Sequence, residues 1–181
     1  MTREQLEHLI RAAGDALQVG EIIVIGSQAA LGSFPEGLPQ SVLMSTEGDV
    51  ILFGDDPTGR LAEQISGAIG ELSRFHETFG IYADGVSMST GRFPTGWRER
   101  LVAVNTPATN GVTGWCAEVH DLVIAKMLAG RPKDIEYTRA LIAAGFVKVE
   151  VVLERLSDTD ATPDEHSRIT RFIESIPRQE S

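Results

Sequence analysis

The sequence contains only one cysteine, Cys116, so no disulfide can form within the chain. A chain without disulfides suits a reducing compartment. It also has no apolar run long enough to cross a membrane, and its first residues lack the apolar stretch of a secretion signal. We therefore expect a cytoplasmic protein without a membrane partner.

Positive charge is also scarce. The chain has 16 lysines and arginines against 26 aspartates and glutamates, which gives a formal net charge of −10. Broad electrostatic binding to DNA or RNA needs the opposite balance, and we exclude it. A nucleic acid held at one local basic patch stays open, and the acidic surplus makes divalent cations easier to accept.

Several familiar site motifs are missing. The histidines show no metal-ligand spacing and Cys116 has no partner thiol, which argues against a structural zinc site. Cys116 precedes His120 by four residues, but it is more typical of a core residue than of a nucleophile. The glycines at 26 and 32 fit neither the dinucleotide fingerprint nor a P-loop, which would end in Gly-Lys-Ser/Thr. Dehydrogenase and P-loop ATPase functions are therefore disfavoured.

The 181 residues suffice for one domain, with or without a small appendage, and 42% of them are apolar, enough for a real core. The pattern of apolar residues changes near Ala117, from short β-branched runs to helical periodicity. We expect an α+β fold in which residues 1–116 form an α/β core with a small mixed sheet. Residues 117–181 would form a helical C-terminal subdomain packed on that core, with a ligand cleft between the two.

Capping signals and periodicity predict the individual elements. Expected helices are Thr2–Gln18, one or two turns at Gln28–Gly32, a helix from Asp55-Asp56-Pro57 with Leu61, Ile65, Ala68, Ile69 and Leu72 on its core face, and helices at Glu118–Leu128, Pro132–Ala144 and Pro163–Ile176. Expected strands are Ile22–Ile25, residues 47–53, a hairpin at Phe79–Met88 turning at Asp84-Gly85, Leu101–Val104 and Val112–Cys116. Lys148–Leu156 stays open between strand and helix.

The first strand ends at Gly26-Ser27. A strand that stops at Gly-Ser and starts a helix offers free backbone N–H groups to a phosphate. Ser27 could equally be a simple helix N-cap, which is the commoner role of such a pair.

Two carboxylates, Glu47 and Asp49, open the next strand. Residues i and i+2 of a strand point to the same side, so both side chains can bind the same divalent metal ions. Acidic residues also commonly open a solvent-facing strand, and it is their combination with the Gly-Ser turn that indicates nucleotidyl transfer. A third acidic contact from Glu77 or Asp84 stays open, with local packing slightly preferred.

Three cations fall within eight residues at the corner where two predicted helices meet: Lys126, Arg131 and Lys133. A cluster of this kind suits a triphosphate. Alone, Lys126 would be interpreted as a solvated helix lysine. Asp134, near a helix start, either orients one of the cations or only complements the helix dipole.

Together, the segments Ile25–Ala30, Ser45–Asp49, Phe75–Val86, Gly96–Val102 and His120–Asp134 resemble a bacterial branch of the DNA polymerase β-like nucleotidyltransferases, related to the AbiEii and MenT toxins. The resemblance covers roughly residues 5–150. It implies a minimal nucleotidyltransferase fold and Mg²⁺-dependent transfer of a nucleotide from an NTP to an acceptor hydroxyl. In the related toxins the acceptor is the 3′ end of tRNA, and an antitoxin protein is a possible partner.

By position, the resemblance assigns Gly26 and Ser27 to the Gly-Ser signature, Glu47 and Asp49 to the metal-binding pair, Lys126 to the nucleotide-contacting lysine and Asp134 to the acidic residue after it. The chain departs from the family pattern at Glu47, where Asp is usual, in its longer loop from Ser27, and in having no clear third carboxylate. These departures keep open a catalytically weak or inactive nucleotide-binding module or toxin–antitoxin component. An enzyme acting on small molecules is a further alternative, which the sequence does not separate from one acting on tRNA.

Overall fold

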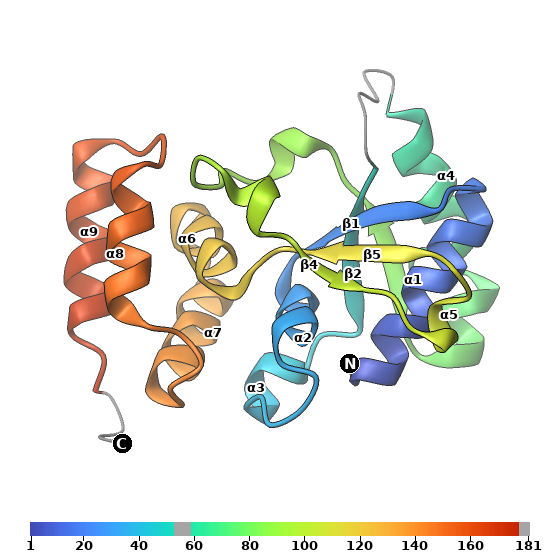
Figure 1. Cartoon of the computed structure of the whole chain (residues 1–181), viewed down its shortest axis with the longest axis horizontal. Coiled ribbons are helices and arrows are strands. Elements are labelled where there is room, and N and C mark those ends of the chain that lie inside the picture. The colour runs from blue at the N-terminus through green and yellow to red at the C-terminus, as the bar shows by residue number, and fades with distance from the viewer. Residues whose placement is uncertain (53–58, 178–181) are drawn as a thin grey trace.

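The computed structural model describes residues 1–52 and 59–177. The described chain is a mixed α+β structure in which one five-stranded sheet has the order β3-β2-β1-β5-β4 (Figure 1). This is the fold class that the sequence predicts, and it is consistent with a minimal nucleotidyltransferase fold. No helix within the described ranges is long and apolar enough to span a bilayer.

The centre of the sheet is the short apolar strand β1. The strands are β1 (Glu21–Ile25), β2 (Glu47–Ile51), β3 (Tyr82–Gly85), β4 (Val102–Val104) and β5 (Thr113–Cys116). β1 pairs antiparallel with β2 and parallel with β5, while β2 and β3 run parallel and β4 and β5 antiparallel. Ile22, Ile23 and Val24 are all buried, as expected for a strand that is covered on both faces.

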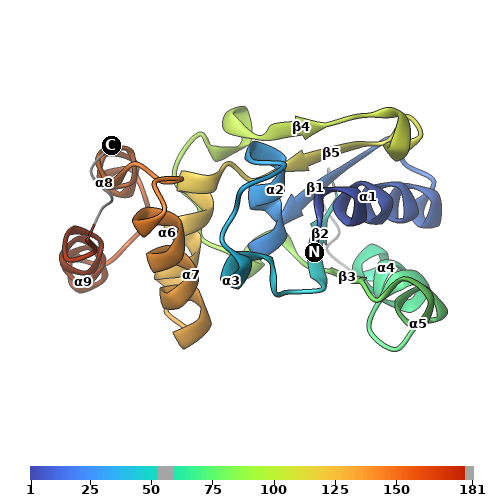
Figure 2. The same cartoon turned by 90° about the horizontal axis from the view of Figure 1, so that it is seen from below.

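Helices cover the sheet and extend from one end of it. They are α1 (Arg3–Leu17), α2 (Ala30–Ser33), α3 (Gln40–Leu43), α4 (Arg60–Ile69), α5 (Arg74–Phe79), α6 (Val119–Ala129), α7 (Pro132–Ala143), α8 (Val149–Ser157) and α9 (Pro163–Glu174), with 3₁₀ turns η1 (Ser27–Ala29), η2 (Met88–Thr90), η3 (Trp97–Arg100) and η4 (Pro107–Thr109). Figure 2 shows α1 and α2 along one face of the sheet, with α6 and α7 between the sheet and the pair α8 and α9.

Helix α1 determines which face of β2 is left for the site. Its Leu9 packs where a side chain at Gly48 would lie, and its Ile10 does the same at Gly114. Because β2 alternates, Gly48 and Val50 face α1, whereas Glu47 and Asp49 face the opposite side of the sheet. The small residue at position 48 therefore lets the helix approach closely and leaves both acids outside that helix contact.

Most predicted elements are confirmed. The capping boxes at Thr2 and Thr162 form as expected, and the turns at Gln28–Gly32 become η1 and α2. Lys148–Leu156, left open between strand and helix, is helical as α8. The predicted helix start at Asp55-Asp56-Pro57 lies outside the described residues. In α4 Ile65 and Ile69 are buried as predicted, whereas Leu61 and Ala68 are exposed. Leu72, predicted on the same core face, lies beyond the end of α4 and is exposed as well.

The predicted hairpin at Phe79–Met88 is wrong. Phe79 ends α5, and Gly80, with φ +68°, terminates that helix in the left-handed conformation. Tyr82–Gly85 then forms a single strand, which pairs in parallel with β2. Asp84-Gly85 belongs to this strand and makes no turn. The alternating apolar and polar residues correctly indicated a strand here, but this strand pairs with β2 and not with a neighbouring arm of the same segment.

Candidate active site

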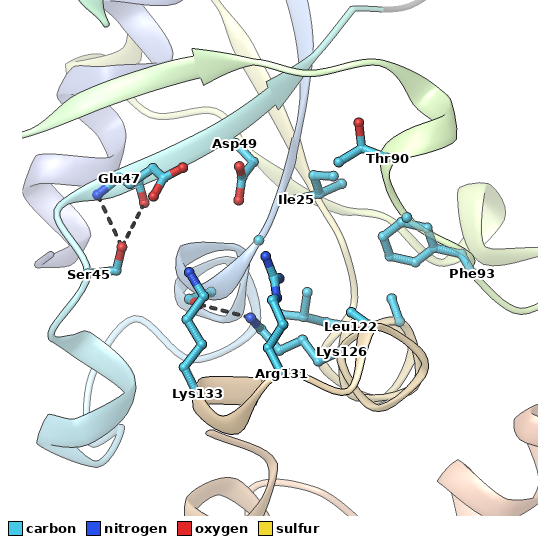
Figure 3. Close-up of a pocket in the computed structure, with 15 residues that line it drawn as sticks. Ile25, Ser45, Glu47, Asp49, Thr90, Phe93, Leu122, Lys126, Arg131 and Lys133 are labelled. Carbon is cyan, nitrogen blue, oxygen red and sulfur yellow. Dashed lines mark hydrogen bonds between the residues drawn. The ribbon is translucent and has the colours of Figure 1, made fainter. Parts of the chain in front are cut away.

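One cavity of about 260 Å³ collects most of the residues that the sequence singles out. Gly26 and Ser27 contribute from the end of β1, and Glu47 and Asp49 from β2. Lys126, Arg131 and Lys133 come from α6 and the start of α7. Figure 3 shows the acidic pair on one side of this cavity and the three cations facing it. The division between residues 1–116 and 117–181 stays a prediction, but both segments line the cavity.

Gly26 brings the end of β1 against the acidic strand. Its backbone has φ +76° and ψ −173°, a conformation that residues with side chains very rarely adopt. A Cβ at this position would lie 1.9 Å from Oδ2 of Asp49. The antiparallel register places Ile25 opposite Asp49, so the carboxylate lies directly over the Gly-Ser turn. Glycine is therefore required here both by the conformation and by the space that Asp49 occupies.

The carboxylate of Asp49 accepts no hydrogen bond from the described residues, and only burial and nearby charges act on it. Burial, and then the negative charge of Glu47, raise its pKa from the ordinary 3.8 to about 6, although Lys126 counteracts them. Asp84 contributes in the same direction as Glu47, because the parallel register of β2 and β3 pairs it with Asp49. Such an arrangement of like charges favours a cation between the carboxylates.

Lys126 is almost completely buried, with 7% of its surface exposed, and is not the solvated lysine that periodicity alone would suggest. Its Nζ donates hydrogen bonds to Ser27 Oγ at 3.0 Å and to Asp134 Oδ1 at 3.1 Å, and lies 4.5 Å from the centre of the Tyr137 ring. Burial lowers the pKa of the ammonium, and Asp134 opposes that shift. The lysine is thus held at the Gly-Ser turn by a fixed set of contacts.

The corner between α6 and α7 provides those contacts. Gly130, with φ +68°, ends α6, and Pro132 begins α7. The buried carboxylate of Asp134 then accepts hydrogen bonds from Lys126 and, at 2.6 Å, from Arg131 Nε. One turn later the Tyr137 hydroxyl donates to the Ser27 carbonyl at 2.6 Å. Asp134 therefore positions two cations from behind the cavity, while Lys133 lies exposed at its edge.

The donor set fits a divalent cation that binds together with a phosphate-bearing substrate. Among residues 1–52 and 59–177, no three His, Cys, Asp or Glu side chains come together as a complete metal site. Glu47 and Asp49 supply carboxylate oxygens, the donors that Mg²⁺ prefers, and Mg²⁺ commonly takes its other ligands from substrate phosphates and water. A pair of close carboxylates with one raised pKa is consistent with that role.

Glu77 and Cys116, two further candidates from the sequence, do not line the cavity, nor does His76 beside Glu77. His76 accepts a hydrogen bond from the Leu72 backbone at 3.1 Å and contacts the ring of Tyr82, which is local packing. Glu77 lies exposed on α5. Cys116 is fully buried, and burial raises the pKa of its thiol to about 12, so it does not have the reactivity of a nucleophile.

The structure adds cavity residues that sequence reasoning missed: Ile25, Ser45, Thr90, Gly91, Phe93, Leu122, Ala125 and Ala129. Tyr137, which anchors Ser27, was missed as well. Its position three residues after Asp134 was a usable signal, because it places both on one face of α7. Phe93 had no such signal, since it lies in the irregular segment between η2 and η3.

A mixed sheet whose Gly-Ser turn faces a strand with two same-side carboxylates is consistent with a nucleotidyltransferase. Consistent with this, the family described as "Nucleotidyltransferase of unknown function (DUF6036)" matches residues 3–176. The chain belongs to this family, and the match covers both the sheet and the C-terminal helices. No curated protein and no solved structure matches the chain.

Proposed function

We propose that the protein is a Mg²⁺-dependent nucleotidyltransferase that moves a nucleotide from an NTP to an acceptor hydroxyl. The observation that carries this proposal is the position of Asp49. Its carboxylate has no hydrogen-bond partner in the described chain, lies against the backbone of Gly26, and shares a cavity with Lys126 and Ser27. One small cavity thus holds the residues that we propose as metal ligand, phosphate-binding turn and counter-charge.

In the proposed reaction, the acceptor oxygen forms a bond to the α-phosphorus. The bond from that phosphorus to the bridging oxygen of the β-phosphate breaks, and pyrophosphate leaves with the bonding electrons. The acceptor proton is released to solvent. Mg²⁺, when bound, would polarise the phosphates and lower the pKa of the acceptor hydroxyl.

The residues of the chain would divide this work. Glu47 and Asp49 hold the cation. The Gly26-Ser27 backbone and the Ser27 hydroxyl bind the phosphates, and Lys126 stabilises the charge that develops on pyrophosphate. Arg131 and Lys133 add positive charge at the cavity edge. Asp134 keeps Lys126 and Arg131 in place without reaching the substrate.

For the acceptor we propose the 3′ end of tRNA, as in the AbiEii- and MenT-type toxins that the sequence motifs resemble, with a small antitoxin protein as partner. The net charge of −10 would restrict tRNA contacts to the surroundings of the three cations. A single acceptor end is compatible with that restriction, whereas a long nucleic-acid track is not.

The test is incorporation of labelled NTP into a tRNA pool. We expect Asp49→Asn to reduce incorporation by more than about 100-fold, because it removes a charged metal ligand. Gly26→Ala should be similarly inactive, since its Cβ occupies the space of the Asp49 carboxylate. Gly80→Ala is the matched control, because Gly80 also has a positive φ but has open space around it. Equal incorporation by wild type and Asp49→Asn would refute the proposal.

A non-catalytic nucleotide-binding module is the second candidate. It is favoured by the absence of a complete three-residue metal site within the described ranges and by Glu47 in place of the usual Asp. Calorimetric titration with NTP separates the two functions. Binding that requires Mg²⁺ supports the enzyme, and binding that is indifferent to Mg²⁺ supports the module.

A further inference from the structure

The cavity has an apolar half that the chemistry of phosphates and metal does not use. Beyond Asp49 its wall is formed by Ile25, Phe93, Leu122, Ala125 and Ala129, with Thr90 at the rim. Figure 3 shows Ile25, Phe93 and Leu122 grouped on one side, away from Glu47 and Lys133 on the other. Triphosphate and Mg²⁺ are strongly hydrated and gain nothing from an apolar wall, so this half fits a different part of a ligand.

We propose that this apolar half binds the base of the incoming nucleotide and that Phe93 is its aromatic contact. This inference rests on the proposed function, and it identifies the part of the site that would hold the nucleoside. A nucleobase is flat, carries a π-face and is recognised by apolar and aromatic surfaces even where no sequence preference exists.

The apolar wall is continuous with the phosphate-binding lysine. Leu122, Lys126 and Ala129 stand at positions i, i+4 and i+7 of α6 and therefore share one face of that helix. One helical turn advances by about 5.4 Å. The apolar residues of α6 therefore lie about one helical turn from Lys126, a distance comparable to that between the phosphates and the base of one nucleotide. The base of an NTP whose phosphates contact Lys126 can reach them. The polar end of the cavity, with Ser45 and exposed Lys133, is left for the acceptor.

Phe93 is already set in place for this contact. Its ring stacks on Trp97 with centroids 4.4 Å apart and planes at 19°, so one of its faces is covered. The opposite face or the edge meets the cavity, and both are geometries in which aromatic rings attract one another. A Cβ at Gly91 would lie 2.8 Å from Phe93 Cε2, so glycine leaves room for the ring.

The segment that carries Phe93 is fixed to the C-terminal helices. Thr95 donates two hydrogen bonds to the Asp158 carbonyl, from its backbone N at 3.2 Å and from Oγ1 at 2.8 Å. Arg92 makes a two-nitrogen ion pair with Glu165 in the first turn of α9. An aromatic contact that is held on both sides loses little entropy when a base stacks on it.

The composition of the apolar half also predicts low selectivity among the four nucleobases. Thr90 provides the only side-chain hydroxyl in the apolar half, and no carboxylate, amide or guanidinium lines it among the described residues. Sites that do not hydrogen-bond the edge of a ligand reject its analogues poorly. We expect the four NTPs to bind with affinities within about tenfold of each other.

Calorimetric titration in Mg²⁺, with each NTP and with inorganic tripolyphosphate, tests the inference. We expect Phe93→Ala to weaken NTP binding by about tenfold or more, because base stacking on an aromatic ring is lost. Its affinity for tripolyphosphate should stay within about twofold of wild type, which also shows that the variant is folded. Phe93→Trp should keep NTP binding. Phe79→Ala, which removes a half-exposed ring on α5 outside the cavity, should behave as wild type.

The possible results distinguish failure of the base subsite from failure of the proposed function. NTP binding that is equal in wild type and Phe93→Ala refutes the base subsite and leaves the phosphate site intact. That result would also be found if the acceptor's base occupied the apolar half. A wild-type protein that binds tripolyphosphate as tightly as NTPs refutes the subsite too. A wild-type protein that binds neither compound refutes the proposed function itself.

Discussion

At the scale of the residue, the site depends on Asp49, a carboxylate whose ionised form is disfavoured by burial and by neighbouring negative charge. Asp49 is partly buried, lies beside Glu47, and has Asp84 opposite it on the next strand. The described chain offers it no hydrogen bond, so the ionised form is stabilised only at a distance, by Lys126 and Arg131. Functional sites commonly contain such carboxylates, because a bound ligand or cation supplies the positive charge or hydrogen bond that the folded protein does not provide.

We therefore predict a pH dependence of stability that originates at Asp49. Its folded-state pKa of about 6 lies above the ordinary 3.8, so between those values the folded state binds more protons than the unfolded state. The free energy of unfolding should fall as pH rises through this window, and Asp49→Asn should remove the loss. In the absence of Mg²⁺ we expect the variant to be more stable than wild type at pH 8, by up to about 3 kcal/mol.

Urea denaturation at pH 4 and pH 8 measures this difference. The advantage of Asp49→Asn should largely vanish at pH 4, where Asp49 is mostly protonated in the folded state. Asp15→Asn, at an exposed position in α1, serves as the control. A variant that is less stable than wild type at pH 8 would show that Asp49 is stabilised by the fold and would contradict the prediction.

At the scale of elements, the corner between α6 and α7 creates the positive side of the site. Gly130 turns the chain so that the first turn of α7 lies behind the last turn of α6. Asp134 then reaches Lys126 and Arg131 together, and Tyr137 reaches the Gly-Ser turn. Although burial opposes it, Arg131 and Lys126 hold the pKa of Asp134 below its usual value.

The substitution Asp134→Ala should therefore reduce both the stability of the protein and its affinity for NTP. It leaves the buried ammonium of Lys126 without its carboxylate, and breaking a buried ion pair typically costs about 3–5 kcal/mol of stability. NTP affinity should fall as well, because Lys126 and Arg131 lose their common anchor. Chemical denaturation and calorimetric titration measure the two effects.

Asp164→Ala is a suitable comparison for Asp134→Ala. Asp164 is also acidic and also lies in the first turn of a helix that begins with proline, but it is exposed. Its loss should remove only a helix-dipole contribution of about 0.3–1 kcal/mol. If Asp134→Ala were equally mild, Asp134 would be a dipole residue and not the support for Lys126.

At the scale of the whole molecule, buried charge joins the sheet-bearing part to the C-terminal helices. Asp121 of α6 is fully buried and accepts hydrogen bonds from Arg100 of η3 at 2.8 Å and from Arg155 of α8 at 3.0 Å. Arg155 also pairs with Glu118, which caps α6. Figure 1 shows α8 and α9 at the opposite end of the molecule from α1, and these contacts connect that end to η3 and α6.

We predict from this network that the two parts unfold together. Both tryptophans, Trp97 and Trp115, precede residue 117, so their fluorescence reports on the sheet-bearing part, whereas far-UV circular dichroism reports largely on the helices. The two signals should give one coincident urea transition. Asp121→Ala should shift both by about 3 kcal/mol, since it strips two guanidinium groups of their partner.

Glu154→Ala, at an exposed position of α8, is the control and should leave both transitions nearly unchanged. Two separate transitions in the wild-type protein would instead identify residues 1–116 and 117–181 as independent units. That result would contradict the coupling proposed here.

Local patterns in the sequence predicted most elements correctly because the forces behind them act over a few residues. Thr2 and Thr162 cap their helices through hydrogen bonds to residues three positions on, and the β-branched run at 22–25 forms a strand for steric reasons. The error at Phe79–Met88 has the opposite cause. Which strand Tyr82–Gly85 pairs with depends on β2, more than thirty residues earlier in the chain.

Residue types and their order alone specify the chemical groups of this site: a Gly-Ser turn after a strand, two same-side carboxylates, and three cations near a helix boundary. These follow from residue type and from periodicities of 2.0 and 3.6, which are properties of the chain alone. Tertiary packing, in contrast, buries Lys126, places Asp134 behind it and brings Phe93 to the cavity that Asp49 lines. Such relations join residues that can be far apart in the chain, as Lys126 and Ser27 are at 99 positions, and they arise only when packing brings those residues together.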